Sequence, residues 1–359
     1  MTPASSPFEF GIASFGELTS SPDRGTPTAK ERLDQVLEAA VLADTAGIDF
    51  VGIGEHHRPD YAASSPAMVL AAIAAQTTRI RLTSAVSVLS TLDPVRLYED
   101  FATLDLMSGG RAEIIAGRGV FVDSFPLYGY NLTDYEALFE EKLDLLLEVN
   151  RHENVTWQGS FRAPLHDAPV MPRALQPEIP VWLGVGGTPA SVVRAAGRGL
   201  PVMFAGIGGD PRGFARLAQL HRAAGEQAGH PAGSLAVGMT GHFYVAENSQ
   251  DAKAAFFEQY ARYWAENTPR SIVMTEEHYE FAVGPTGALL VGSPAEVAEK
   301  ILSQHEAIGH GRFMAQFIGN MPTPQLLRSI ELLAGEVMPI VRRELGLDTS
   351  PTAARISAE

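Results

Sequence analysis

Hydrophobic positions along this chain fall into short runs that alternate with longer segments of mixed polarity. Runs such as Phe50-Val51-Gly52-Ile53 are hydrophobic at nearly every position, which is typical of a strand buried on both faces. The pattern predicts eight strands, at 8–13, 49–54, 80–89, 112–116, 180–184, 201–205, 235–245 and 312–318. The longer segments carry hydrophobic residues at helical spacing, and they predict helices at 28–46, 66–77, 94–108, 133–150, 189–198, 211–229, 251–267, 294–308 and 323–344.

Strands that alternate with helices indicate an α/β fold with a parallel sheet, and eight of them favour a closed (β/α)8 TIM barrel. Short polar residues that precede a proline support the predicted helix starts, because their side chains can cap the first turn. These pairs are Ser65-Pro66, Asp93-Pro94, Thr188-Pro189, Asp210-Pro211, Ser293-Pro294 and Thr323-Pro324. Gly47 and Gly309 suit left-handed C-terminal caps.

Two stretches exceed what a minimal barrel needs. Residues 151–179 read as an irregular insertion, and residues 246–292, between strands seven and eight, are far longer than a usual connection. The second stretch is rich in aromatic residues, so we expect it to form a lid or a substrate wall. We expect one domain over residues 1–345 and a disordered tail over 346–359.

Composition narrows the function classes. Of 359 residues, 45% are hydrophobic and 19% charged, which suits a large packed core, and the net charge of −15 argues against binding nucleic acid or anionic membrane. The absence of cysteine excludes disulfides, thiolate metal sites and a cysteine nucleophile. Without a targeting pattern or a run of about 18 apolar residues, we expect a soluble cytoplasmic enzyme.

The strand at 49–54 ends abruptly in Glu55-His56-His57. Ligands of such barrels bind at the carboxyl ends of the strands, and histidine suits proton transfer near neutral pH. Consecutive residues point to different sides, so the two histidines would bind one metal ion poorly. We expect no metal site, a functional His56, and a structural role for His57 beside a carboxylate.

Two further segments suggest an anion site. Gly186-Gly187-Thr188 follows a strand and precedes a helix, so backbone amides and the start of that helix can face a phosphate, although a glycine-rich turn alone is a weak signal. Arg118 lies between two glycines after another strand. It suits a phosphate or carbonyl contact, and the alternative is a rim salt bridge with Asp123 or Glu136.

Together these segments resemble the luciferase-like flavin-dependent monooxygenases, the superfamily of bacterial luciferase. The resemblance rests on EHH at 55–57, DPVRLYEDFATLDLMSGGR before a strand that ends in GRG, GVGGTPASVVRAAGRGLP, and VGSPAEVAEKI. It covers roughly residues 8–343 in the same order.

The resemblance implies a barrel that holds FMN at the carboxyl ends of its strands. His56 matches a histidine that supports the oxygen chemistry, with Glu55 or a neighbour orienting it. Ala85-Val86 matches a non-proline cis peptide under the flavin ring. The phosphate contacts it implies are Arg118, Gly186, Gly187, Thr188 and Ser191.

Some positions depart from luciferase. Gly117 replaces a reactive cysteine, Tyr135-Glu136 falls where a second phosphate-binding arginine is expected, and Gly187 replaces a glutamate. These changes argue against light emission, and they favour reduced FMN that binds as a dissociable cosubstrate.

The resulting prediction is an oxidoreductase that uses reduced FMN and oxygen on a small organic substrate. It implies a separate flavin reductase and a homodimer. The alternatives are an F420-dependent hydride-transfer enzyme of the same fold, a metal-dependent barrel hydrolase, and a non-catalytic flavin-binding protein.

Overall fold

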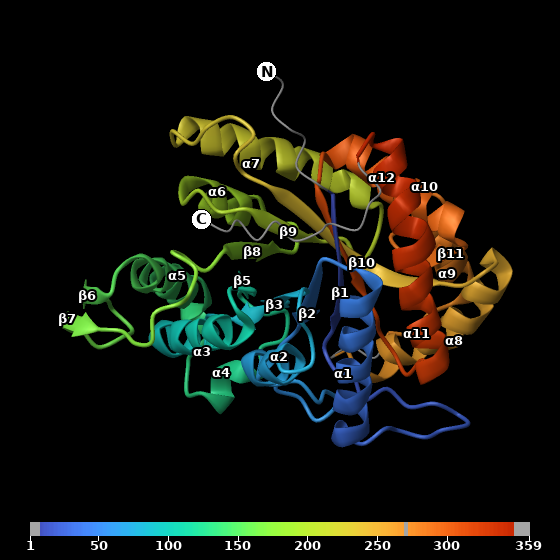
Figure 1. Cartoon of the computed structure of the whole chain (residues 1–359), viewed down its shortest axis with the longest axis horizontal. Coiled ribbons are helices and arrows are strands. Elements are labelled where there is room, and N and C mark those ends of the chain that lie inside the picture. The colour runs from blue at the N-terminus through green and yellow to red at the C-terminus, as the bar shows by residue number, and fades with distance from the viewer. Residues whose placement is uncertain (1–7, 269–271, 348–359) are drawn as a thin grey trace.

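A closed barrel of parallel strands forms the centre of the protein (Figure 1). The computed structural model describes residues 8–268 and 272–347. Within them the barrel strands are β1 (Glu9–Ser14), β2 (Phe50–Ile53), β3 (Arg81–Ser84), β5 (Ala112–Gly117), β8 (Val181–Val185), β9 (Val202–Ala205), β10 (Val237–Val245) and β12 (Arg312–Gln316). Pairing of β1 with β12, and of β9 with β10, closes the barrel. The predicted (β/α)8 TIM barrel is therefore confirmed.

Helices surround the barrel and follow the strands in the predicted order (Figure 1). They are α1 (Ala29–Ala46), α2 (Pro66–Ala74), α3 (Pro94–Ser108), α5 (Tyr135–Arg151), α6 (Pro189–Gly197), α7 (Ala215–Gln227), α10 (Pro294–Ile308), α11 (Thr323–Leu332) and α12 (Met338–Glu344). A 3-10 turn, η2 (Pro211–Phe214), precedes α7, and a π-helical segment, η3 (Leu333–Val337), joins α11 to α12. None of the helices in the described residues is long and apolar enough to cross a membrane.

Local signals explain several helix ends. Asp93 accepts hydrogen bonds from two first-turn amides of α3, Asp210 caps η2, and Ser293 forms a capping box with Glu296. Gly47 and Gly309 adopt the expected left-handed conformation, with φ of 88° and 69°.

Three expected caps are not formed as predicted. Among the described residues, the side chains of Ser65 and Thr188 make no capping hydrogen bond, and Thr323 lies inside α11, one residue after its N-cap. The proline at the first turn already removes one orphan amide, so these helices start without the side-chain contact.

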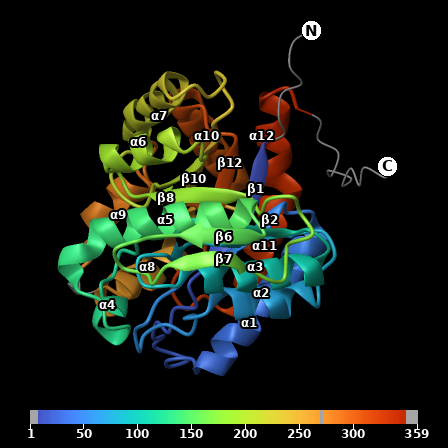
Figure 2. The ribbon, with the colours of Figure 1, turned by 90° about the vertical axis from the view of Figure 1, so that its left-hand side faces the viewer.

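The two long insertions are more regular than the sequence suggests. Residues 151–179 contain the antiparallel pair β6 (Asn154–Trp157) and β7 (Leu165–Pro169), so the expected irregular segment is partly a hairpin. Figure 2 shows this hairpin beside α5. The 246–292 stretch contains α8 (Ser249–Glu266), α9 (Glu276–Val283) and β11 (Leu290–Gly292), and β11 pairs with β10. Short elements also follow the barrel strands: β4 (Ser87–Val88), α4 (Ser124–Leu127) and η1 (Leu132–Asp134).

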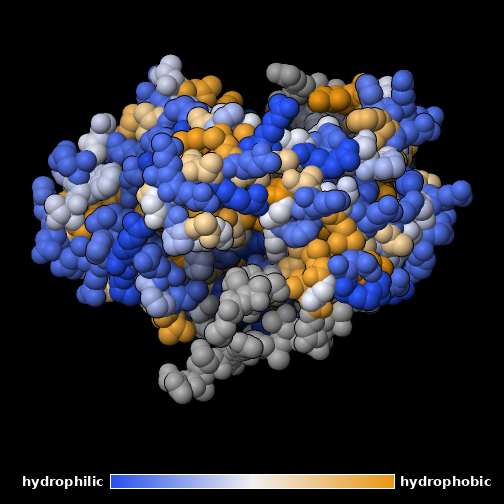
Figure 3. Space-filling view, turned by 90° about the horizontal axis from the view of Figure 1, so that it is seen from above, coloured by the Kyte–Doolittle hydropathy of each residue, from blue (hydrophilic) through white to orange (hydrophobic). Residues whose placement is uncertain are grey.

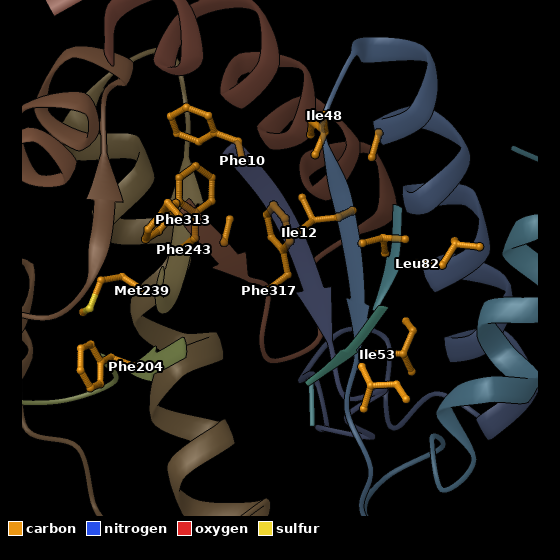
Figure 4. Close-up of a cluster of buried hydrophobic side chains, with 14 of the residues drawn as sticks. Phe10, Ile12, Ile48, Ile53, Leu82, Phe204, Met239, Phe243, Phe313 and Phe317 are labelled. Atoms are coloured by element: carbon orange, nitrogen blue, oxygen red, sulfur yellow. The ribbon is translucent and has the colours of Figure 1, made fainter. Parts of the chain in front are cut away.

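Side chains on alternate strand positions build two hydrophobic layers. On β1, Phe10 and Ile12 face outward and pack with residues such as Leu82 between sheet and helices (Figure 4). Ala13 belongs to the separate inner layer. Seen from above, hydrophilic residues cover much of the surface and hydrophobic ones show between them (Figure 3).

The amino-terminal end of the barrel interior is filled. Arg312 forms a two-point salt bridge with Glu113, with nitrogen–oxygen distances of 2.7 and 2.9 Å. The guanidinium carbon of Arg312 also lies 3.8 Å from the centre of the Phe50 ring and 4.6 Å from that of Trp182. The interior is therefore open toward the carboxyl ends of the strands, where the predicted site residues lie.

Candidate active site

A cavity of about 390 Å³ opens at the carboxyl ends of the barrel strands. This volume lies within the usual range for small-molecule and cofactor sites. Its wall includes residues that the sequence singled out and that follow four different barrel strands: Glu55, His56, Ala85, Val86, Arg118, Gly186 and Thr188. The barrel thus brings together side chains that lie more than 130 positions apart in the chain.

His56 lies among aromatic rings on the cavity wall. Its ring centre is 4.9 Å from that of Phe15, 4.3 Å from that of Tyr61 and 4.6 Å from that of Phe121. Burial, with smaller effects of the positive charges of Arg58 and His57, lowers the pKa of His56 to about 3. At neutral pH the imidazole is uncharged, so one ring nitrogen carries a hydrogen and the other accepts one.

Glu55 orients the neighbouring histidine and not His56. Its buried carboxylate lies 2.8 Å from Nε2 of His57, and it accepts a hydrogen bond of 2.9 Å from the backbone amide of Val88. Of the two residues expected to orient His56, Glu55 or a neighbour, Glu55 is therefore excluded, because its carboxylate binds His57 and Val88. The contact with the Glu55 carboxylate is the structural role expected of His57.

The Ala85-Val86 peptide is cis, as the family resemblance implied. Both residues line the cavity between β3 and β4. The Val86 side chain lies against Gly117 and Gly184, because a methyl group added to either glycine would come within 2.5 or 2.7 Å of it. Glycine at both positions therefore makes room for Val86 in the cavity floor.

Positive charge gathers where the cavity meets α6. Arg118 donates a hydrogen bond of 3.1 Å to the hydroxyl oxygen of Ser191, a buried residue in the first turn of that helix. The guanidinium of Arg118 also pairs with Glu136 and lies 5.2 Å from the centre of the Tyr135 ring. Both interpretations of Arg118 thus apply: it forms the rim salt bridge with Glu136, and it contacts the segment expected to bind phosphate.

The sequence did not point to Arg194, a second arginine near the Ser191 hydroxyl. Arg194 pairs with Glu136 at 2.8 Å, and its Nη1 lies 3.5 Å from the Ser191 hydroxyl oxygen. The three-residue spacing from Ser191 places both on one face of α6, which could have indicated it. Glu136 therefore bridges two guanidinium groups where the sequence suggested only a missing cation.

The loop before α6 is open to a ligand. Gly186, Gly187 and Thr188 are exposed, and a methyl group added to either glycine would meet no heavy atom of the described chain within 4 Å. Gly187 has φ of 120°, a conformation that side chains disfavour. Because Thr188 does not cap the helix, its hydroxyl remains available beside the cavity.

The long insertion also reaches the cavity. Tyr263 of α8 lines it, and Asn267 just after α8 ties this region to the loops that follow β1 and β2. Asn267 accepts a hydrogen bond of 2.6 Å from Thr19, receives one of 3.0 Å from Tyr61 on its backbone carbonyl, and donates one to the Asp60 carbonyl. The insertion therefore contributes a fixed part of the cavity wall.

Comparison with known proteins identifies relatives over nearly the whole chain. The family model described as luciferase-like monooxygenase matches residues 8–311. Limonene 1,2-monooxygenase of Rhodococcus erythropolis is 26% identical over 351 residues, which cover 94% of this chain and 89% of that protein. The crystal structure of monooxygenase RslO1 from Streptomyces bottropensis has a TM-score of 0.81 and 28% identity, and covers 92% of this chain and 99% of its own.

Two more distant structures share the fold alone. The oxygenating constituent of 3,6-diketocamphane monooxygenase from Pseudomonas putida, in complex with FMN, has a TM-score of 0.76 at 19% identity. The coenzyme F420-dependent tetrahydromethanopterin reductase from Methanopyrus kandleri has a TM-score of 0.71, also at 19% identity. Each match covers 93% of this chain and 99% of the other.

Proposed function

Because the chain belongs to the luciferase-like monooxygenase family, we propose that it oxidises a small organic molecule with reduced FMN and molecular oxygen. The observation that supports this most is a cavity with two chemically distinct parts. One part offers the guanidinium of Arg118, which donates a hydrogen bond to the buried Ser191 hydroxyl, and the open loop before α6. The other is largely apolar and contains the neutral His56.

The residues present fit a flavin mononucleotide. Arg118, Ser191, Thr188 and the amides of 186–188 would hold its phosphate, because arginine and helix-start amides suit this group. Ala85 and Val86 would lie under its ring. When bound, reduced FMN would supply the electrons that activate oxygen.

The chain's own residues would control protons and water. His56 would accept or donate one proton through a ring nitrogen, since burial keeps the imidazole uncharged. The rings of Phe15, Tyr61 and Phe121 around it would exclude bulk water from that position. Glu55 would act through the loop, by fixing His57 and Val88, and would touch no reacting atom.

A titration tests the cofactor. We expect the protein to bind reduced FMN with micromolar affinity or better, and to bind riboflavin more weakly because riboflavin lacks the phosphate. The Arg118→Gln variant should lose most of the preference for FMN over riboflavin and leave riboflavin binding unchanged. No change in flavin absorbance or fluorescence, in either redox state, would exclude the proposed cofactor.

The role of His56 has a separate test. His56→Ala should lower turnover at least about tenfold while FMN binding survives, since the substitution removes the proton-transfer group and none of the phosphate contacts. Product formation from a panel of cyclic ketones and monoterpenes measures turnover, and flavin fluorescence measures binding. An unchanged rate would remove His56 from this role.

An F420-dependent hydride transfer without oxygen is the second candidate, because the fold is shared with an F420-dependent reductase. Side-by-side titrations with FMN and F420 discriminate between the two. A third possibility, flavin binding without catalysis, predicts that FMN binds and no substrate is consumed.

The proposal extends to the surroundings of the enzyme. A separate flavin reductase would supply reduced FMN, and the protein would act as a cytoplasmic homodimer without nucleic-acid or membrane partners. The net charge of −15 supports the last point. Sedimentation of the purified protein measures the oligomeric state, and oxygen uptake with and without an added reductase tests the supply of reduced FMN.

A further inference from the structure

A second histidine faces the same cavity. His242 lies near the carboxyl end of β10, lines the cavity, and is only 1% exposed. Among the described residues, neither ring nitrogen has a hydrogen-bond partner. Buried polar groups normally have a partner, so two orphaned nitrogens in a residue that lines a cavity point to a ligand that supplies one.

Other buried histidines show that this arrangement is specific to the cavity. His57 pairs with Glu55, and His221 lies 2.9 Å from the Leu200 carbonyl oxygen. His310 also lacks a partner on its ring nitrogens in the described part of the chain, but it lies at the amino-terminal end of β12 among Phe8 and His305. His242 therefore differs from these three in combining orphaned nitrogens with a position on the cavity wall.

The surroundings of His242 are aromatic and uncharged. The rings of Tyr260, Tyr263 and Trp264, all from α8, contact it edge-on with ring centres 5.8, 5.6 and 6.5 Å away. The cavity-lining residues of β9, β10 and β12 carry no formal charge. Burial lowers the pKa of His242 to about 3, so the neutral ring presents one donor and one acceptor and cannot balance a charged ligand.

A second polar side chain lies beside it. Gln316 of β12 is the register partner of His242, is also buried, and lines the same cavity. In the barrel order, β12 lies four strands from β5, which carries the Arg118 loop, in either direction. Gln316 therefore faces the cavity from the side opposite the Arg118 loop, and His242 lies on the strand next to it.

We propose that His242 hydrogen-bonds an oxygen atom of the organic substrate, and that this substrate is a compact, uncharged, mainly apolar molecule with a carbonyl or hydroxyl group. The inference rests on the proposed function for its cofactor, and it adds the substrate class and the residue that recognises it. Carboxylates, amines and phosphate esters are excluded as the group that His242 contacts, because the neutral wall offers no opposite charge.

The test compares probes that share one carbon skeleton: 2-decalone, 2-decalol and decalin. Binding is measured with and without oxidised FMN, in the wild-type protein and in His242→Phe, which keeps a ring and removes both nitrogens. We expect the substitution to weaken binding of the ketone and the alcohol roughly fivefold to tenfold and to leave decalin unchanged or tighter. His242→Gln, which keeps a donor and an acceptor, should retain most of the preference.

A matched control and a second measurement support the comparison. His310→Phe removes an equally buried, unpartnered imidazole outside the cavity and should alter none of the three affinities. In protein labelled with 15N-histidine, the imidazole signal that disappears in His242→Gln is assigned to His242. Adding 2-decalone should shift this signal, and adding decalin should not. This measurement on the wild-type protein remains decisive if His242→Phe fails to fold.

The inference would be overturned if His242→Phe lost equal affinity for 2-decalone and for decalin. It would also be overturned if the His242 imidazole signal did not respond to 2-decalone. These outcomes are distinct from failure of the proposed function. If FMN binds but the protein shows no preference for 2-decalone and 2-decalol over decalin, only the role of His242 is wrong. If the preference is present and FMN does not bind, the cofactor is wrong.

Discussion

Three charged side chains lie close together where the cavity meets α6: Arg118, Arg194 and Glu136. Arg118 and Arg194 both pair with Glu136, so one carboxylate neutralises part of the positive potential that a phosphate would meet. Glu136 is well exposed, so its interactions are partly screened by solvent. Glu136, which the sequence marked as unfavourable for phosphate, would therefore compete with a bound phosphate for these arginines.

We expect Glu136→Gln to tighten FMN binding by about threefold to tenfold, because Arg118 becomes available to the phosphate, while Arg194 still pairs with Glu140. The gain should shrink as salt is added. Flavin fluorescence titrations at low and high salt provide the measurement, with riboflavin as a ligand whose affinity should stay constant. Glu148→Gln, on the same helix but paired with His152, is the matched control; unchanged or weaker FMN binding in Glu136→Gln would contradict the argument.

Some residues of the candidate site could be predicted from the sequence, and others could not. The position of Glu55, His56 and His57 at a strand end was visible in the sequence, because strand polarity and alternation are local properties. The second partner of Glu55, the backbone amide of Val88, could not be predicted, because another strand contributes it. His242 lacks the strand-end signal of His56, because it lies within the long apolar strand β10, and such a histidine resembles an ordinary core residue until the cavity beside it is known.

Among the elements, β5 and β8 depend on glycine where they contact Val86. A methyl group at Gly184 would come within 2.7 Å of a Val86 methyl carbon, much closer than packed carbon atoms approach. Val86 lies on the cavity wall, so any shift that relieves the overlap changes the shape of the cavity.

Gly184→Ala should therefore destabilise the fold by about 1–3 kcal/mol, the usual cost of overpacking, and weaken FMN binding at least about tenfold. Urea unfolding and flavin titration measure the two effects. Gly197→Ala is the control, because a methyl group there meets no heavy atom within 4 Å in the described structure and helix α6 should gain stability. If Gly184→Ala matches the wild type in both assays, Val86 does not set the shape of the cavity.

Most elements could be predicted because their signals are local. All eight predicted strands and nine predicted helices correspond to elements of the structure, with 211–229 and 323–344 each divided by a local change of helix type. The β6–β7 hairpin was missed because its strands alternate weakly and depend on pairing with each other. The short helices α4 and α9 have too few turns to show a period.

At the scale of the whole molecule, buried ionisable groups determine how stability depends on pH. Burial lowers the pKa values of His56, His242 and His310 to about 3, whereas unfolded histidine titrates near 6.5. Below pH 6.5 the unfolded chain therefore binds protons that the folded chain does not, and stability falls. Glu17 has the opposite effect, because burial raises its pKa from 4.5 to about 7, so its contribution to stability is lost as the pH rises from about 4.5 to about 7.

We expect the free energy of unfolding to fall between pH 6.5 and 5, by up to about 1.4 kcal/mol per pH unit for each buried neutral histidine. Urea unfolding at several pH values measures the slope. His56, His242 and His310 should contribute about equally to the dependence of the free energy of unfolding on pH. His310→Phe should therefore remove about one third of their combined slope. A constant stability across this window would show that the imidazoles can become charged in the folded protein.

The pairing of β1 with β12 has a consequence for biosynthesis. The first strand of the barrel completes its hydrogen bonding only with the last, about 300 residues later. At the usual rates of translation, an edge of β1 or of its partners stays unpaired for about 15 to 60 seconds. A nascent barrel therefore presents an open sheet edge to other chains, and holdase chaperones that shield such edges should raise the yield of folded protein more than faster synthesis does.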